Sequence, residues 1–390
     1  MALLLDALFG AVAFGHFAVD LLNGQRAVLL AYLSGPLGLT NTALGFFSTL
    51  YVIAGALFQP VFGFIVDRVG ARWVAALGIL WMAVFFGLAL VVPGTGALWL
   101  LILASLGSAA YHPAGTMQAT LRGRTHLAGR ETTSTAYFFV FGQTGHFFGP
   151  LLAGPLLDRF GPIGLLWLAV GLGVVGIFIS RQLVDAISPV RSMPIQPVVK
   201  NPGSKPRWTK LFKFPVVAFA LVAAFQAWSQ QNMITFVPKY LSDLGQSSSA
   251  YGVVAALFMG GSAFGSAVGG NLADKFGKRR VAVTSLALAS VPLFLVSLVG
   301  GSPWLYLIIP VAGALTGAVH SILVVFAQRL IPGGMALASG LILGFMFSAG
   351  AIGTSVCGYL ADQVGFPFVF QLTSGIALAG SILAITLQKE

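Results

Sequence analysis

Charged side chains are scarce in this sequence. Only 8% of its 390 residues are Asp, Glu, Lys or Arg, and 57% are hydrophobic, whereas a soluble globular domain carries about 25% charged residues. A water-soluble fold of this size could not bury so much apolar side chain, so lipid is the expected solvent for most of the chain. A single cysteine, Cys357, excludes a disulfide within the chain and a cysteine-rich metal cluster.

Motifs for chemistry are also missing. The sequence contains no recognisable metal-binding motif, nucleotide-binding loop or nucleophile constellation, and no ATP-binding segment. We therefore expect a protein that is not an enzyme, uses no cofactor or metal, and draws its energy from a proton gradient. The net charge of +11 would suggest a nucleic-acid partner for a soluble protein, but membrane topology explains it better, and we expect no nucleic-acid partner.

Long apolar runs occupy most of the sequence. A helix needs about 20 apolar residues to cross a bilayer, and runs of this length alternate with Gly, Pro and charged residues. They predict an all-α membrane protein with twelve transmembrane helices, over residues 5–33, 42–66, 73–92, 98–121, 132–157, 162–183, 214–240, 248–272, 281–299, 304–330, 337–361 and 367–387. The polar stretch 184–213 is predicted to be a cytoplasmic linker between two six-helix bundles, 1–183 and 214–390.

Basic residues indicate the orientation of these helices, because Lys and Arg are retained on the cytoplasmic side of a membrane. With the N-terminus inside, cytoplasmic loops or ends hold every Lys and Arg except Arg26, Arg159 and Lys239. The opposite orientation would place nearly all of them on the wrong side. We therefore expect both termini in the cytoplasm.

The pattern G-x-x-x-D-x-x-G occurs four times, at residues 63–70, 154–161, 270–277 and 358–365. The first and third copies fall in predicted cytoplasmic loops, whereas the second and fourth fall in outside loops. Each half of the chain is therefore predicted to consist of two inverted three-helix units. Nested inverted repeats of this kind build the two halves of a major-facilitator transporter.

The chemistry of this motif suits a contact that changes with conformation. Its glycines permit a tight helix end and close backbone approach, and its Asp can lie at a neighbouring helix N-terminus or pair with a basic residue. A solvated loop of ordinary turn residues would show the same pattern. We assign a conformational-switch role to the cytoplasmic copies and their flanks, namely Gly63, Asp67, Arg68, Gly70, Arg72, Gly270, Asp274, Lys275, Gly277 and Lys278.

The chain resembles the major facilitator superfamily over essentially its whole length. A narrower resemblance, to the fosmidomycin-resistance efflux transporters, rests on residues 15–20 (GHFAVD), 59–63 (QPVFG), 107–113 (GSAAYHP), 325–333 (VFAQRLIPG) and 339–345 (SGLILGF). One position departs from that group, which has an acidic residue directly after the His-Pro pair, where this chain has Ala114. If that carboxyl takes part in proton coupling, this chain must couple differently.

A glycine-proline run in the fifth predicted span is similar to a motif of the superfamily's drug-proton antiporters, although Ala153 replaces one glycine. Its residues are Gly145, Gly149, Pro150 and Gly154. The resemblance implies export in exchange for protons. Small residues at this spacing also serve plain helix packing, which is our interpretation of Gly261, Gly265 and Gly269.

Asp20 is the acid that lies clearly within a predicted span. Ionisable groups at membrane depth are costly and mark functional sites. His16, Asp20 and Asn23 have i, i+4, i+7 spacing and share one helix face. We predict that Asp20 carries the coupling proton together with His16 and His112; a purely structural hydrogen bond is the alternative.

The resemblance implies that spans 1, 4, 7 and 10 line a central cavity, and polar residues gather in these spans. Arg26 points about 240° around the helix from Asp20, so it could bind an anionic substrate, pair with another residue, or extend to the membrane surface. The predicted substrate-binding residues are Asn23, Arg26, His112, His146, Gln230, Asn232 and His320. Hydrogen bonds between helices are the alternative role for the amides of span 7.

These features favour a monomeric, multi-pass protein of the bacterial inner membrane that exports a small anionic or amphiphilic compound in exchange for protons. The same residues would serve an uptake symporter for a small organic anion, because the fold runs in either direction. A lipid-handling or sensing protein without coupled transport is a third interpretation. The expected partners are protons, a small-molecule substrate and the lipid bilayer.

Overall fold

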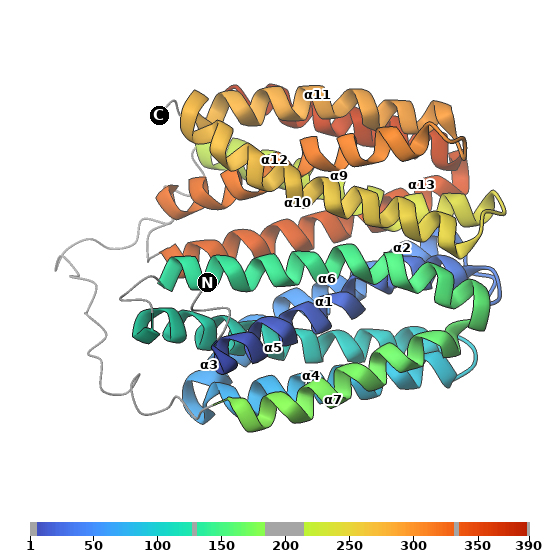
Figure 1. Cartoon of the computed structure of the whole chain (residues 1–390). Coiled ribbons are helices and arrows are strands. Elements are labelled where there is room, and N and C mark those ends of the chain that lie inside the picture. The colour runs from blue at the N-terminus through green and yellow to red at the C-terminus, as the bar shows by residue number, and fades with distance from the viewer. Residues whose placement is uncertain (1–5, 127–130, 184–213, 331–334, 388–390) are drawn as a thin grey trace. The chain divides into compact units, whose positions relative to one another are not determined.

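The computed structural model describes residues 6–126, 131–183, 214–330 and 335–387, and all regular structure in these ranges is helical (Figure 1). The chain divides into two compact units, Met1–Ser192 with Pro238–Ala256 and Met193–Val237 with Leu257–Glu390. The predicted linker 184–213 lies outside the described residues. The predicted boundaries of the two bundles, 1–183 and 214–390, stay a prediction.

The helices follow the apolar runs of the sequence. They are α1 (Ala7–Ser34), α2 (Asn41–Leu57), α3 (Gln59–Val69), α4 (Ala71–Val91), α5 (Gly96–His126), α6 (Glu131–Phe160), the 3₁₀ turn η1 (Pro162–Leu165), α7 (Leu166–Gln182), α9 (Phe214–Asp243), α10 (Ser248–Phe276), α11 (Lys278–Val299), α12 (Leu305–Leu330) and α13 (Met335–Ala384). Helices α2 and α3 together cover the second predicted span. Helix α13 covers the last two, with non-helical backbone at Gly365 between them.

Within the described ranges, nine helical segments are long and apolar enough to cross a bilayer, with α2 and α3 taken as one segment and α13 as another. The chain is therefore a multi-pass helical membrane protein. The finer expectations, twelve spans with both termini in the cytoplasm, stay predictions.

The last glycine of each repeated motif marks a break between helices. Gly70, Gly161, Gly277 and Gly365 have φ angles of 91°, 61°, 90° and 83°, values that side chains with a Cβ rarely adopt. Gly70 separates α3 from α4, and Gly277 separates α10 from α11. The four equivalent positions thus share a positive φ, which agrees with their repeat relationship.

The other switch residues flank these breaks. Gly63 and Arg68 lie on α3, Arg72 at the start of α4, Gly270 and Lys275 on α10, and Lys278 at the start of α11. The guanidinium of Arg68 lies 3.9 Å from the ring centroid of Phe64. The side chains of Asp67 and Asp274 lie outside the described residues, so the switch role stays a prediction.

Close glycine contacts join α1 to α6 in the first unit. A Cβ on Gly145 would overlap the carbonyl oxygen of Phe17, and a Cβ on Gly149 would overlap that of Leu21. From the other side, a Cβ on Gly24 would lie 2.8 Å from the carbonyl oxygen of His146. The glycines of the fifth predicted span therefore let two helix backbones touch, which sets the distance between their side chains.

The second unit uses the same device between α10 and α12. Gly261, Gly265 and Gly269 face the backbone of Pro310, Ala314 and Ala318, too closely for any Cβ. This contact confirms the packing role predicted for the three glycines of span 8.

Candidate functional site

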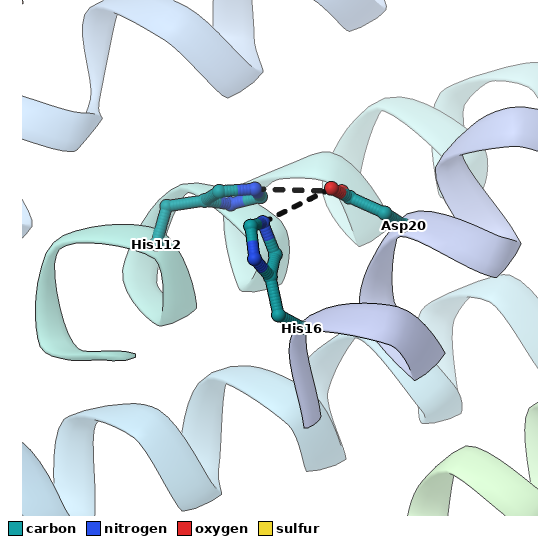
Figure 2. A group of neighbouring side chains, drawn as sticks. All are labelled: His16, Asp20 and His112. Atoms are coloured by element: carbon teal, nitrogen blue, oxygen red, sulfur yellow. Dashed lines mark ion pairs between the residues drawn. The ribbon is translucent and has the colours of Figure 1, made fainter. Parts of the chain in front are cut away.

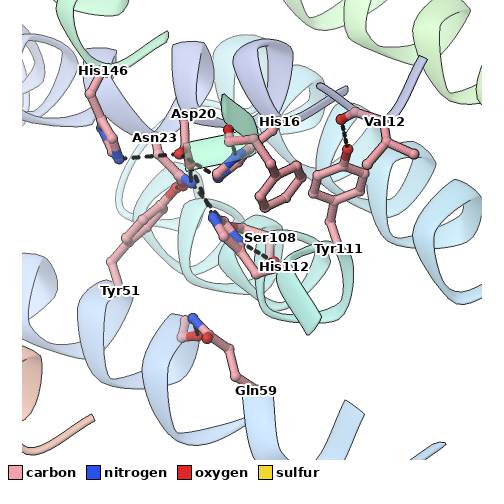
Figure 3. Close-up of polar contacts among 12 residues, drawn as sticks. Val12, His16, Asp20, Asn23, Tyr51, Gln59, Ser108, Tyr111, His112 and His146 are labelled. Atoms are coloured by element: carbon pink, nitrogen blue, oxygen red, sulfur yellow. Dashed lines mark hydrogen bonds and ion pairs between the residues drawn. The ribbon is translucent and has the colours of Figure 1, made fainter. Parts of the chain in front are cut away.

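The carboxylate of Asp20 lies at the centre of a cluster of three histidines in the first unit. The Nε2 atoms of His16, His112 and His146 lie 3.1, 3.4 and 3.6 Å from its oxygens. Asp20 and His16 come from α1, His112 from α5 and His146 from α6, and their rings point toward the carboxylate (Figures 2 and 3). Asp20 is 4% exposed and His16 is 2% exposed, so the centre of the cluster is shielded from solvent.

Backbone carbonyls orient two of the three rings. The Nδ1 atom of His16 lies 2.7 Å from the carbonyl oxygen of Phe138, and that of His112 lies 2.7 Å from the carbonyl oxygen of Ser108. A carbonyl oxygen only accepts, so Nδ1 carries the hydrogen in both rings. The Nε2 atom of each ring is therefore directed at Asp20.

Ring contacts hold His16 in this orientation. Its imidazole stacks on the ring of Phe138, with centroids 3.9 Å apart and planes 18° from parallel. The ring of His112 meets it almost at right angles, at 5.0 Å. These two ring contacts restrict rotation of the His16 imidazole, so its Nε2 atom stays directed at the carboxylate that His112 also contacts.

A chain of neutral polar groups continues the cluster toward α2. Asn23 donates from Nδ2 to Oδ1 of Asp20 at 2.9 Å and to Oγ of Ser108 at 2.9 Å, and it accepts from the hydroxyl of Tyr51 at 2.7 Å (Figure 3). The network therefore joins α1, α2, α5 and α6. The shared helix face predicted for His16, Asp20 and Asn23 is confirmed by these contacts.

Gly142 on α6 makes room for the cluster. A Cβ at this position would lie 2.5 Å from Cε1 of His16 and 2.6 Å from Oδ2 of Asp20. Atoms without a covalent bond rarely approach this closely, so the site requires the absence of a side chain here. Together with the contact between Gly24 and α6, this fixes the depth at which Asp20 and His16 sit against α6.

Arg26 lies farther along α1, away from the carboxylate. It is 6% exposed, so it does not extend to the surface. Its guanidinium carbon lies 5.0 Å from the ring centroid of Tyr51. Among the described residues, neither its Nε nor the side-chain amide of neighbouring Gln25 has a hydrogen-bond partner.

The remaining predicted substrate-binding residues belong to the second unit. Gln230 on α9 donates to Oγ of Ser262 at 2.7 Å. Asn232, fully buried on the same helix, donates to Sγ of Cys357 at 3.0 Å and to Oγ1 of Thr373 at 3.1 Å. His320 lies on α12, its ring centroid 6.4 Å from that of Phe347. Their substrate-binding role stays a prediction.

Sequence reasoning missed four parts of the site: Tyr51, Ser108, Phe138 and Gly142. Ser108 lies one helical turn before His112, and Gly142 lies three residues before the glycine-proline run of the fifth predicted span. These spacings were usable signals. Tyr51 and Phe138 carried none, because aromatic residues are frequent throughout this chain.

A multi-pass helical membrane protein that buries an acid among three histidines has the features of a membrane transporter, since ionisable groups within spans mark substrate or ion pathways. Residues 29–372 match the family described as MFS_1 like, so the chain belongs to this family. It is a transporter, and not an enzyme.

Individual relatives agree. The chain is 25% identical over 386 residues to the fosmidomycin resistance protein of Escherichia coli (strain K12), covering 96% of this chain and 91% of that protein. It is 27% identical over 358 residues to the uncharacterized MFS-type transporter YfnC of Bacillus subtilis (strain 168), covering 90% and 85%. This confirms the predicted resemblance to the superfamily and to the fosmidomycin-resistance group.

Solved structures show the same fold. The nucleoside transporter NupG superimposes with a TM-score of 0.73, at 17% identity, covering 97% of this chain and 98% of that one. A bacterial homolog of the human lysosomal transporter Spinster, in an inward-facing and unoccupied conformation, gives a TM-score of 0.76 at 13% identity, covering 97% and 94%.

Proposed function

We propose that this protein is a proton-coupled secondary transporter that exports a small anionic or amphiphilic compound by alternating access. It would act as a monomer in the bacterial inner membrane, with twelve spans, cytoplasmic termini and no cofactor beyond the proton gradient. The observation that carries this proposal is the buried carboxylate of Asp20 between three histidine Nε2 atoms.

The geometry of the cluster supports proton exchange. Where Nδ1 carries the hydrogen of a neutral ring, Nε2 presents a lone pair, and a lone pair facing a carboxylate oxygen is repelled unless a proton lies between them. His16 and His112 both have this arrangement. Gaining or losing such a proton changes the charge of the cluster, and the ring rotations it allows would couple α1 to α5.

The position of Arg26 supports an anionic cargo. A buried guanidinium with an unsatisfied Nε is costly, and an anion entering the bundle would offer the missing acceptor. Arg26 lies on the same helix as Asp20, so substrate and proton would act on one element. The Escherichia coli relative is a fosmidomycin resistance protein, which supports drug export as the direction of transport.

Transport into proteoliposomes tests the proposal, with fosmidomycin as the probe. An exporter that exchanges drug for protons accumulates drug in vesicles with an acidic interior, whereas a symporter accumulates it in vesicles with an acidic exterior. Drug movement that is independent of the imposed pH gradient would support the lipid-handling or sensing interpretation.

The Asp20→Asn variant separates the role of the carboxylate from that of the fold. It keeps the shape of the side chain but cannot carry a negative charge, so we expect gradient-driven accumulation to fall to the level of empty vesicles. The matched control is Asp243→Asn, which removes an exposed acid that pairs with Lys239 and should transport like the wild type. Gradient-driven transport that persists in Asp20→Asn would contradict the coupling role.

A further inference from the structure

The cluster around Asp20 also has the geometry of a metal site. One ring nitrogen of His16, one ring nitrogen of His112 and a carboxylate oxygen of Asp20 all lie within 4.8 Å of one another (Figure 2). The two contacts with Asp20 measure 3.1 and 3.4 Å. Ligand atoms bound to one tetrahedral zinc ion at about 2.1 Å lie about 3.4 Å apart. The contacts of His16 with Oδ2 and of His112 with Oδ1 of Asp20 have about this length, so a bound ion would require only that the two rings draw together.

The second contact of each ring is the one that metal-binding histidines make. A histidine that ligates a metal donates its other ring N–H to a carboxylate or a backbone carbonyl, which fixes the tautomer and aims the free lone pair. Here Nδ1 of His16 meets the carbonyl oxygen of Phe138, and Nδ1 of His112 meets that of Ser108, each at 2.7 Å. Both free lone pairs are therefore directed at the same carboxylate, that of Asp20.

We propose that His16, Asp20 and His112 bind a divalent transition-metal ion of the zinc class. The Nε2 atom of His146, 3.6 Å from Oδ2 of Asp20, stands near enough to become the fourth ligand after a small ring movement. Two or three imidazoles with one carboxylate select zinc, copper, nickel or cobalt over magnesium or calcium, which prefer oxygen ligands.

The metal would occupy the lone pairs that protons use. Zinc bound at the cluster would therefore block proton exchange, and this consequence rests on the proposed function. Binding itself does not, since it depends only on the four side chains. No metal motif in the sequence marks this site, because its ligands come from three helices that lie far apart along the chain.

Zinc binding can be measured without transport. The full chain, purified without a histidine tag and placed in lipid nanodiscs, would be titrated with zinc chloride by isothermal titration calorimetry at neutral pH. We expect one zinc ion per chain. The His112→Gln variant should bind zinc at least about 10-fold more weakly, because even the loss of a group that only supports a ligand costs this much.

The matched control is His320→Gln, which removes a histidine from the second unit and should leave the zinc affinity unchanged. Equal zinc affinity in His112→Gln and the wild type, or no binding by the wild type, would overturn the proposal. Thermal unfolding without metal checks that both variants fold. If His112→Gln does not fold, the visible spectrum of the wild type with cobalt decides, because a tetrahedral nitrogen-oxygen site absorbs strongly and an octahedral hydrated ion does not.

The outcomes also separate this proposal from the transport function. Zinc binding by a chain that shows no gradient-driven drug transport would leave the metal site standing and refute the function. Proton-driven drug transport by a chain that binds no zinc would support the transport function and refute the metal site. Inhibition of transport by zinc in the wild type, with the same zinc sensitivity in Asp243→Asn, would support both.

Discussion

Replacing Gly142 by alanine should damage both the stability and the function of the protein. The new Cβ would lie 2.5 Å from Cε1 of His16 and 2.6 Å from Oδ2 of Asp20, whereas carbon atoms in contact normally lie about 3.5 to 4.0 Å apart. One side must therefore move by about 1 Å. Both neighbours are held by hydrogen bonds, so neither can give way without losing one.

The size of the effect follows from measured cases of overpacking. A methyl group forced into a well-packed interior typically costs about 1 to 3 kcal/mol, and the higher helix propensity of alanine offsets up to about 1 kcal/mol of this cost. We expect the Gly142→Ala variant to unfold at a lower temperature than the wild type in the same detergent, as followed by tryptophan fluorescence. We also expect its gradient-driven transport to fall sharply, because any relaxation separates the carboxylate of Asp20 from the imidazole of His16.

Gly171 in α7 provides the matched control, since a Cβ there would meet nothing within 4 Å. Alanine favours a helix over glycine by about 0.8 to 1 kcal/mol, so Gly171→Ala should be at least as stable as the wild type and should transport normally. If Gly142→Ala unfolded and transported like Gly171→Ala, the close approach of α6 to the cluster would be wrong.

Two further predictions concern polar contacts in the first unit. Tyr51→Phe removes the hydrogen bond to Asn23, costs about 1 kcal/mol, and should slow transport in proteoliposomes while circular dichroism stays unchanged; a normal rate would remove Tyr51 from the site. Asp158, beyond the predicted span 132–157, accepts hydrogen bonds from the backbone amides of Ser248 and Ser249 at the start of α10. Its partial burial opposes ionisation, but the hydrogen bonds from Ser249 and Ser248 lower its pKa below the usual value. Because the pKa is lowered, the contact stabilises the protein above the usual Asp pKa of about 3.9, and this stabilisation is lost as the pH falls through the lowered value. Asp158→Asn should therefore unfold at a lower temperature than the wild type at pH 7. The difference in unfolding temperature should shrink in acid. A constant difference across that range would contradict the contact.

Much of the fold could be predicted from local sequence. Apolar runs located the helices, because a bilayer demands a minimum length of apolar chain and allows no unpaired backbone. The repeated motif located the helix breaks at Gly70 and Gly277, since the positive φ found there favours glycine. The apolar runs and the repeated motif are both local features, so a single sequence is enough to detect them.

The candidate site was predictable only in part. His16, Asp20 and Asn23 share one face of one helix, and helical periodicity alone places them together. The arrival of His112 and His146 at the same carboxylate depends on how α5 and α6 pack on α1. Tyr51 belongs to α2 and Gly142 to α6, and the spacing of these residues along the chain does not predict their contacts with the cluster.

The sequence by itself determined that this protein lives in a membrane, where its helices lie, and which ionisable residues must be satisfied within them. Each of these follows from the cost of placing polar groups in lipid, and that cost depends on the type of each residue and its neighbours along the chain. Only the tertiary structure decided that three histidines surround one carboxylate. That outcome depends on glycines that let α1 and α6 touch, and thus on distances between backbones far apart in the chain.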